Sequence, residues 1–260
     1  MADLSATQPS TDMSLRKVPW MPGPGLLVSA RSIAESKLII DAGARWLDLK
    51  EPRFGSLGRP SLELIFEVLE LDIPESMQVS VAGGELGSWT LDLDASLAAK
   101  LPARTYLKIA LANCSGTPWQ IEAERISRAL IRRSQLILVH YADFKQANAP
   151  SWHEVIATAK SLGGKFVLID THGKEAGGLL DHYSREQLEA MIEMAKQLKL
   201  GVALAGSLKL EQLKSLSHSK ADWLGVRSAI CHEAHRTGDV CLDRLQQAIA
   251  LFPSFSSVGS

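Results

Sequence analysis

The sequence predicts an α/β protein that folds as a single (β/α)8 barrel, and three observations lead to this prediction. Short β-rich runs alternate with amphipathic helical segments eight times. The units are evenly spaced, and a chain of 260 residues is typical of one such barrel. The apolar fraction of 46% is sufficient for one large core, and no linker divides the units. An open doubly wound sheet is the alternative, but it rarely needs eight evenly spaced parallel strands.

The predicted elements follow one another in a regular order along the chain. The strands are expected at residues 25–30, 46–52, 78–84, 105–111, 136–143, 165–171, 201–207 and 223–229. Between them, apolar residues recur every three or four positions, as a helix with one buried face requires. These helical segments include 32–43, 61–70, 121–133, 184–198 and 242–252. Several end at a glycine before the next strand, as at Gly43, which suits a helix C-cap.

The two ends of the chain differ in composition from the predicted barrel. Residues 1–25 are rich in Ser, Thr, Pro and Gly and lack the apolar run of a signal peptide. We therefore expect a flexible arm over residues 1–22, the catalytic barrel over 23–252 and a flexible tail over 253–260. No apolar run approaches the length of a membrane span, so we expect a cytoplasmic protein without a membrane partner.

Overall charge and cysteine content exclude several classes of function. The formal net charge is −1, so no general attraction to nucleic acid or to an anionic membrane is expected. The cysteines, Cys114, Cys231 and Cys241, are widely spaced and form no CxxC pair. This pattern predicts reduced thiols rather than a disulfide framework or a zinc site. A homo-oligomer is compatible with the sequence, which does not decide the oligomeric state.

Ionisable residues alternate with apolar ones on several predicted strands. Side chains of a strand point alternately to the two faces of a barrel wall. Leu47 and Leu49 therefore share one face, and Asp48 and Lys50 share the other, toward the interior. The same alternation places three more charged residues inside: Lys108, Asp170 and Arg227. All lie near the carboxyl ends of strands, where barrel enzymes have their active sites.

Cations outnumber acids in this predicted site. The cations are Lys50, Lys108, Lys174 and Arg227, and the acids are Asp48 and Asp170. Because an unpaired buried charge is costly, the surplus predicts an anionic ligand, and a phosphorylated substrate fits. The alternative is a structural layer of internal salt bridges, for instance between Asp48 and Lys50.

A lysine in such surroundings is suited to covalent catalysis. Nearby cations and partial burial lower the pKa of a lysine, so its amine becomes a nucleophile toward a carbonyl. The resulting iminium acts as an electron sink, and Asp48, Lys108 and Asp170 are placed to move protons. Spacing alone leaves open which lysine is the nucleophile.

The turns after the seventh and eighth predicted strands are candidates for phosphate binding. In many barrels, phosphate is bound by backbone N–H groups of these turns and of the helix N-termini that follow. Glycine allows close approach of a ligand to the backbone, and serine adds a hydroxyl donor. The candidates are Gly206, Ser207, Gly225, Arg227 and Ser228. The alternative is that these are ordinary turns with N-capping serines.

Three further features have simpler interpretations. His232 and His235 are three residues apart, whereas the HExxH zinc helix needs four, so an exposed loop is expected. Residues 83–87, GGELG, predict a loop over the barrel mouth. His140 either faces the site or is a satisfied structural histidine, and the sequence does not decide between these.

The segment DLKEPRFGSLG at 48–58 resembles the D-x-K-x-P-x-x-G-S-L-G segment of the (5-formylfuran-3-yl)methyl phosphate synthases, also called 4-(hydroxymethyl)-2-furancarboxaldehyde-phosphate synthases. The similarity continues through LLVS at 26–29, YLK at 106–108, YAD at 141–143, DTHGK at 170–174, ALAGS at 203–207 and GVRSAIC at 225–231. It therefore covers nearly the whole predicted barrel. Three features differ from the family pattern. Ser228 replaces a glycine, His140 replaces a small residue, and the N-terminal arm is additional.

The resemblance implies a lyase of methanofuran-type cofactor biosynthesis that condenses two molecules of glyceraldehyde 3-phosphate, with loss of phosphate and water. Carried over by motif, Lys50 forms the Schiff base and Lys108 is the proton acceptor. Asp48, Asp170 and Lys174 complete the catalytic set, and no metal or organic cofactor is implied. Two other functions stay open: another Schiff-base aldolase for a small sugar phosphate, and a non-catalytic barrel that binds a phosphate ligand.

Overall fold

The computed structural model describes most of the predicted barrel. The described residues are 24–89, 97–98, 100–102, 105–130, 135–173, 175 and 177–252. The arm predicted over 1–22 and the tail predicted over 253–260 lie outside the described residues, and so does Lys174.

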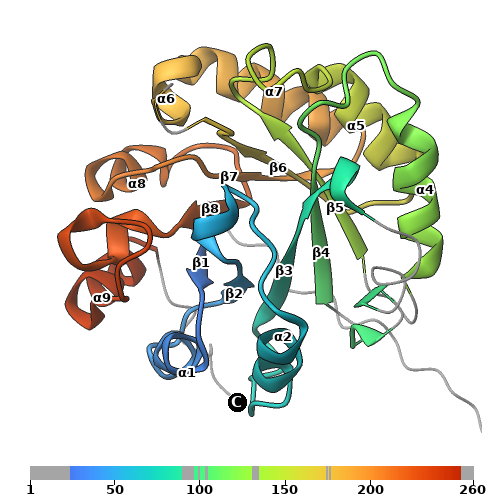
Figure 1. The fold of residues 1–260 in the computed structure, drawn as a ribbon. Helices are drawn as coiled ribbons and strands as arrows, with labels where there is room; N and C mark the ends of the chain where they lie inside the picture. The colour runs from blue at the N-terminus through green and yellow to red at the C-terminus, as the bar shows by residue number, and fades with distance from the viewer. Residues whose placement is uncertain are drawn as a thin grey trace, which may run out of the picture.

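In the described part of the chain, eight parallel strands close into a barrel in the order β1 to β8 (Figure 1). They are β1 Gly25–Ala30, β2 Trp46–Leu49, β3 Gln78–Glu85, β4 Thr105–Ala110, β5 Gln135–Tyr141, β6 Phe166–Asp170, β7 Gly201–Leu204 and β8 Trp223–Val226. Strand β1 pairs with both β2 and β8, which closes the cylinder. The predicted single (β/α)8 barrel is confirmed.

Helices cover the outside of the barrel (Figure 1). They are α1 Ile33–Asp41, α2 Leu62–Leu69, α4 Trp119–Ala129, α5 Trp152–Ser161, α6 Leu179–His182, α7 Arg185–Gln197, α8 Leu210–Leu216 and α9 Leu242–Ala250. Serine side chains cap the first turns of α1, α5 and α7, at Ser32, Ser151 and Ser184. Each cap satisfies an otherwise unpaired N–H group and stabilises its helix by about 1 kcal/mol. None of the described helices is long and apolar enough to cross a membrane.

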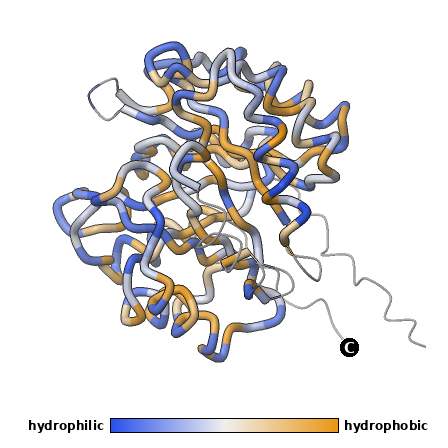
Figure 2. Tube along the Cα trace, turned by 45° about the vertical axis from the view of Figure 1, so that its right-hand side comes forward, coloured by the Kyte–Doolittle hydropathy of each residue, from blue (hydrophilic) through white to orange (hydrophobic). Residues whose placement is uncertain are grey.

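Alternation along the strands separates two apolar layers. Leu47 and Leu49 of β2 pack outward, in the large layer between strands and helices. Trp46 of the same strand points inward and joins a smaller layer inside the barrel. Figure 2 shows hydrophobic stretches through the middle of the molecule and hydrophilic residues on many outer turns. Asp48, which lies between the two leucines, is fully buried on the inner face, as the alternation predicts.

Aromatic rings fill the amino-terminal end of the barrel. The ring centroid of Trp46 lies 5.0 Å from that of Tyr106 and 4.8 Å from that of Trp223. Phe166 completes the group, 5.5 Å from Trp46. Gly201 leaves room for it, because a Cβ atom at this position would clash with the Phe166 ring. Since this end is packed with rings, the inward-facing polar groups gather at the carboxyl ends of the strands.

Candidate active site

A cavity of about 540 Å³ opens at the carboxyl ends of β2, β6, β7 and β8. Its wall includes most of the residues predicted for the site: Lys50, Asp170, Gly206, Ser207, Gly225, Arg227 and Ser228. Asp48 and Lys108 are buried inside the barrel, and Lys174 lies outside the described residues. One end of the barrel therefore brings together residues from five strands that are far apart in sequence.

Asp48 and Lys108 form an ion pair inside the barrel. Lys108 Nζ lies 2.5 Å from Asp48 Oδ1, and both side chains are almost completely buried. The hydroxyls of Ser80 and Ser29 donate to Oδ1 and Oδ2 of the carboxylate at 2.7 and 2.9 Å. An internal salt bridge therefore exists, and Lys108 is a partner of Asp48 at ion-pair distance.

The electrostatic surroundings keep Asp48 ionised. Burial raises the pKa of this carboxyl, but Lys108 and Lys50 beside it lower the pKa more strongly, with help from Ser80. The net result is a pKa below the ordinary value of a carboxyl group. Both lysines therefore act electrostatically on the same carboxylate.

Lys50 lies directly after the end of β2, where the DLKEPRFGSLG segment begins to form a turn. Its backbone N–H donates to the carbonyl of Ala30, and its half-buried side chain reaches the cavity wall. The turn is closed by Glu51 N–H, which donates to the Gly58 carbonyl at 2.8 Å. A Cβ atom at Gly58 would clash with the Glu51 carbonyl oxygen, which explains the glycine at this position. The motif therefore fixes the backbone conformation beside Lys50.

The loop after β6 is held on two sides. Ser56 donates to the carbonyl oxygen of Thr171 at 2.5 Å, which ties the loop after β2 to the residue that follows Asp170. Asp143 accepts the N–H groups of His172 and Gly173 at 2.8 and 2.7 Å. Burial raises the pKa of Asp143, but these two N–H donors lower it, so its net pKa falls. Asp143 therefore acts as an ionised anchor for the backbone of His172 and Gly173.

A second polar pair, between the half-buried Glu85 and the buried Tyr141, was not predicted from the sequence. The Tyr141 hydroxyl donates to Glu85 Oε1 at 2.5 Å, and the N–H of Ala112 donates to Oε2 at 2.8 Å. Burial, together with the negative charge of Glu85, raises the pKa of Tyr141 well above its ordinary value. The prediction of a loop over 83–87 is partly wrong, because β3 continues to Glu85. Alternation alone would have placed Tyr141 inside the barrel, two residues beyond Val139.

The turns after β7 and β8 lie in the cavity wall, as predicted for phosphate binding. Gly206 and Ser207 have left-handed backbones, with φ of 110° and 53°. The carbonyl of Gly206 accepts the N–H of Leu179, so the turn is attached to the start of α6. Gly225 packs closely, since a Cβ atom there would lie 3.0 Å from that of Ala205. The side chain of Ser207 is exposed and that of Ser228 half-buried, so both hydroxyls are accessible.

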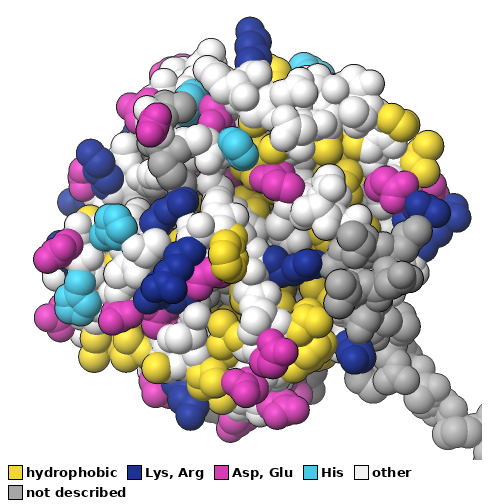
Figure 3. Space-filling model, viewed as in Figure 1, with side chains coloured by type: hydrophobic (Ala, Val, Ile, Leu, Met, Phe, Trp, Pro, Cys, Tyr) yellow, Lys and Arg dark blue, Asp and Glu magenta, His cyan; other side chains and the backbone are white. Residues whose placement is uncertain are grey.

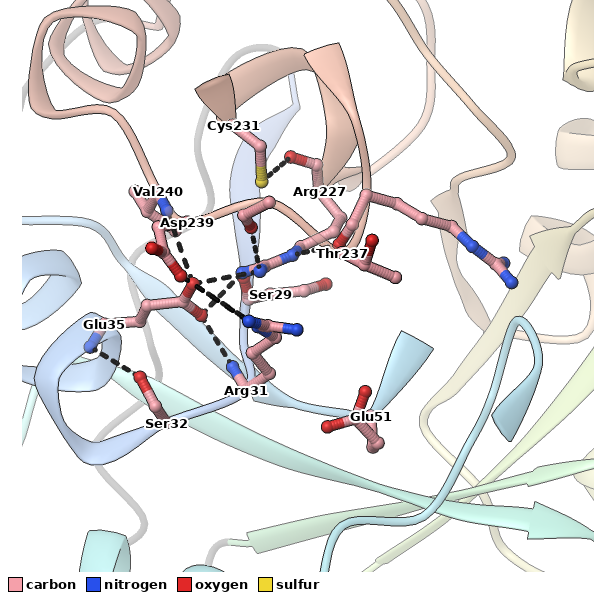
Figure 4. Close-up of polar contacts among 12 residues, drawn as sticks. Ser29, Arg31, Ser32, Glu35, Glu51, Arg227, Cys231, Thr237, Asp239 and Val240 are labelled. Carbon is pink, nitrogen blue, oxygen red and sulfur yellow. Dashed lines mark hydrogen bonds and ion pairs between the residues drawn. The ribbon is translucent and has the colours of Figure 1, made fainter. Parts of the chain in front are cut away.

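Arg227 has a different environment from the one predicted (Figure 4). Its guanidinium donates to both oxygens of Glu35 at 2.6 and 2.9 Å. The remaining donors go to the carbonyls of Ser29, Arg236 and Gly238, at 3.0, 2.9 and 2.7 Å. Because all five donors of the group are used, the Arg227 charge is balanced without a ligand. We therefore expect any phosphate contact at this position to come from its backbone N–H.

His140 lies on the outer face of β5. Its Nε2 atom lies 3.1 Å from the Tyr183 hydroxyl, and its ring packs 5.5 Å from that of Trp152. The structural interpretation of this histidine is therefore the better one, and its size does not affect the cavity. His232 and His235 are exposed, as predicted. Across the described ranges, no three His, Cys, Asp or Glu side chains are grouped so that they could hold a metal ion.

A sequence model of the family described as 4-HFC-P synthase matches residues 26–249, which is nearly all of the barrel. The chain belongs to this family. Its similarity to relatives named (5-formylfuran-3-yl)methyl phosphate synthase extends over most of both chains. The relative from Methanothermobacter thermautotrophicus is 31% identical over 236 residues, covering 88% of this chain and 99% of its own. A relative from Archaeoglobus fulgidus is 27% identical over 217 residues, covering 79% and 90%.

Solved structures with the same fold are more distant from this member of the 4-HFC-P synthase family. The 3-hexulose-6-phosphate synthase of Salmonella typhimurium superposes with a TM-score of 0.56 at 14% identity, over 87% of this chain and 98% of its own. Phosphoribosyl anthranilate isomerase of Thermus thermophilus gives a TM-score of 0.56 at 15% identity, over 87% and 97%. At this level of identity, the comparison supports the barrel fold alone.

Proposed function

We propose that this protein is a (5-formylfuran-3-yl)methyl phosphate synthase, a lyase of methanofuran-type cofactor biosynthesis. It condenses two molecules of glyceraldehyde 3-phosphate and releases one phosphate and water. The observation that carries the proposal is the grouping of Lys50, Lys108 and the ionised Asp48 beside the cavity, in a chain of the 4-HFC-P synthase family.

In this proposal Lys50 is the nucleophile. Of the two lysines near Asp48, Lys108 is already held in a buried ion pair, whereas Lys50 reaches the cavity wall. The Lys50 amine adds to the triose carbonyl carbon to give a carbinolamine. Loss of the carbinolamine hydroxyl as water then gives the iminium. The iminium is the electron sink for the later steps, so the proposal includes no metal or organic cofactor.

Lys108 has the proton that this first step requires. Before the reaction, its ammonium group is the ion-pair partner of Asp48. Lys108 therefore first donates a proton to the departing hydroxyl, and only then can it accept one. Once neutral, Lys108 removes a proton from the carbon next to the iminium, and the electron pair moves to the iminium nitrogen. Asp48 stabilises the protonated form before and after these transfers. Asp170 and Lys174 are assigned to further proton transfers by motif.

The cavity suits phosphorylated substrates. The turns that contain Gly206, Ser207, Gly225 and Ser228 present backbone N–H groups and hydroxyls at the carboxyl end of the barrel. In this proposal, the turns after β7 and β8 bind the phosphate of the molecule that is attached to Lys50.

The test is conversion of glyceraldehyde 3-phosphate alone. We expect the purified protein to form a furan aldehyde chromophore and to release one phosphate per furan. The rate of furan formation by Lys50→Ala should be lower than that of the wild type by about 10³-fold or more, because the variant lacks the covalent nucleophile. Another sugar-phosphate aldolase would give no furan from this substrate alone, and a non-catalytic binding barrel would give no product. Furan formation by Lys50→Ala at the normal rate would exclude the proposed role of Lys50.

A further inference from the structure

The outer part of the cavity wall carries a second group of basic residues. We call it the outer rim; it consists of Lys209, His235, Arg236 and Arg244. Lys209 immediately precedes α8, Arg244 lies on α9, and the other two belong to the loop between β8 and α9. Figure 3 shows Lys, Arg and His side chains on the surface over α8 and α9, among some acidic ones. The rim residues differ from those of the turns already assigned to phosphate binding, although Lys209 follows Ser207 by two positions.

The rim is not neutralised by the acids near it. Glu211 is the acid of the cavity wall that belongs to this region, against three permanently charged rim residues. In the part of the chain that the structure describes, the ion pairs involve none of the rim side chains. The Arg227 guanidinium, which also borders the cavity, is balanced by Glu35 and adds no free charge. The surplus positive charge therefore faces the cavity.

Buried hydrogen bonds hold the loop that carries the rim (Figure 4). Arg227, 6% exposed, donates to the carbonyl of Arg236 at 2.9 Å and to that of Gly238 at 2.7 Å. Its partner Glu35 accepts the N–H of Val240 at 3.3 Å. The backbone of Arg236 is thus fixed before any ligand arrives, which reduces the ordering cost of binding.

The same loop contains local backbone strain just before the rim. Glu233 and Ala234 both have left-handed backbones, with φ of 54° and 55°. For residues other than glycine this conformation costs roughly 1–2 kcal/mol each. Such strain persists where the surrounding structure enforces it, and it is frequent at ligand sites. Here it directs the chain so that His235 and Arg236 border the cavity.

We propose that the outer rim binds the phosphate of a second triose phosphate, the one that condenses with the molecule held on Lys50. This inference rests on the proposed function, which requires two phosphorylated molecules in one site. Arg236 and Arg244 are its main donors, because a guanidinium forms paired, charge-assisted hydrogen bonds with phosphate oxygens. The turns after β7 and β8 then bind one phosphate, and the rim binds the other.

The double variant Arg236→Gln/Arg244→Gln tests this proposal with two readouts. The first is titration with inorganic phosphate by calorimetry: the wild type should bind two phosphates per chain and the variant one. The second is the concentration of glyceraldehyde 3-phosphate that gives half-maximal furan formation, which should rise about 10- to 100-fold for the loss of charged hydrogen bonds. Borohydride trapping of the first molecule on Lys50 should remain as in the wild type.

The matched control is Arg128→Gln, which removes an arginine from the exposed face of α4. It should bind two phosphates and keep the wild-type half-saturating concentration. If the double variant binds as many phosphates as the wild type and needs no more substrate, the rim proposal is overturned. If the wild type forms no Lys50 adduct, the proposed function fails instead, and the phosphate stoichiometry still decides whether the rim binds an anion.

Discussion

At the scale of single residues, the site is organised around Asp48. Its carboxylate contacts Lys108 and accepts hydroxyl hydrogen bonds from Ser29 and Ser80. A fully buried carboxylate needs such contacts, because burial alone would favour the neutral acid. The alternation of charged and apolar residues on β2 and β4 could predict that these groups face inward. It could not predict that Lys108 lies at ion-pair distance from the acid.

Replacing Lys108 by Met should remove the ion-pair partner of Asp48 at 2.5 Å. We expect the free energy of unfolding to fall by about 3 kcal/mol, because a buried carboxylate is left with less compensation. Urea denaturation would measure this change. The double variant Asp48→Asn/Lys108→Met should recover much of the stability, although neither protein should form the furan. If the effects of the two substitutions were simply additive, the two groups would not be coupled as described.

His140 should make the stability of the fold depend on pH. Burial lowers its pKa from 6.5 to about 4, so the folded protein favours the neutral ring. Above pH 6.5 the ring is neutral in both states, and this part of the free energy of unfolding is fully present. It is lost as the pH falls from 6.5 toward 4, because the unfolded chain binds the proton at a higher pH than the folded protein does. By pH 4.5 we expect this one group to cost about 2–3 kcal/mol.

The measurement is the difference in unfolding free energy between pH 7.5 and pH 4.5, for the wild type and for His140→Phe. The phenyl ring keeps the packing against Trp152 but does not titrate in this range. The variant should therefore lose less stability on acidification than the wild type. Equal losses in the two proteins would mean that His140 does not carry this pH dependence.

At the scale of elements, each strand contributes alternate residues to the outer layer beneath the helices and to the barrel interior. The outward residues Leu47 and Leu49 join the layer beneath the helices, and the inward residues build first an aromatic end and then a polar one. Because this alternation has a period of two, it can be read from the sequence, as can the helices from their own period. The mistaken loop at 83–87 shows the limit: its glycines suggest a break, whereas β3 continues to Glu85.

The aromatic end predicts a large effect from a very small substitution. A Cβ atom in Gly201→Ala would clash with the Phe166 ring, which packs against Trp46. Since the barrel interior has little spare space, we expect the free energy of unfolding to fall by about 1–3 kcal/mol. The matched control is Gly87→Ala, where an added Cβ meets no atom within 4 Å. Thermal and urea denaturation of both variants would measure the difference, and equal stability would contradict the packing described.

At the scale of the whole molecule, the barrel joins residues that no local pattern connects. Glu35 and Arg227 are 192 positions apart, yet they form a bidentate ion pair beside the cavity. The alternation of side chains along the strand predicted that Arg227 faces the barrel interior. Because the predicted cations outnumbered the predicted acids there, Arg227 was expected to bind an anionic ligand. Its acidic partner on α1 was missed, because a helix residue has no strand register that marks it as inward. The end of the barrel that carries the candidate site was predictable, because it follows from the direction of the strands alone.

Covalent trapping is the sharpest test of a Schiff base at Lys50. The protein would be incubated with glyceraldehyde 3-phosphate and borohydride, and the modified peptide identified by mass analysis, with Lys50→Ala treated in the same way. We expect a reduced adduct on Lys50 in the wild type and none at any position in the variant. An adduct on Lys108 instead, or no adduct in a wild-type enzyme that turns over normally, would contradict this expectation.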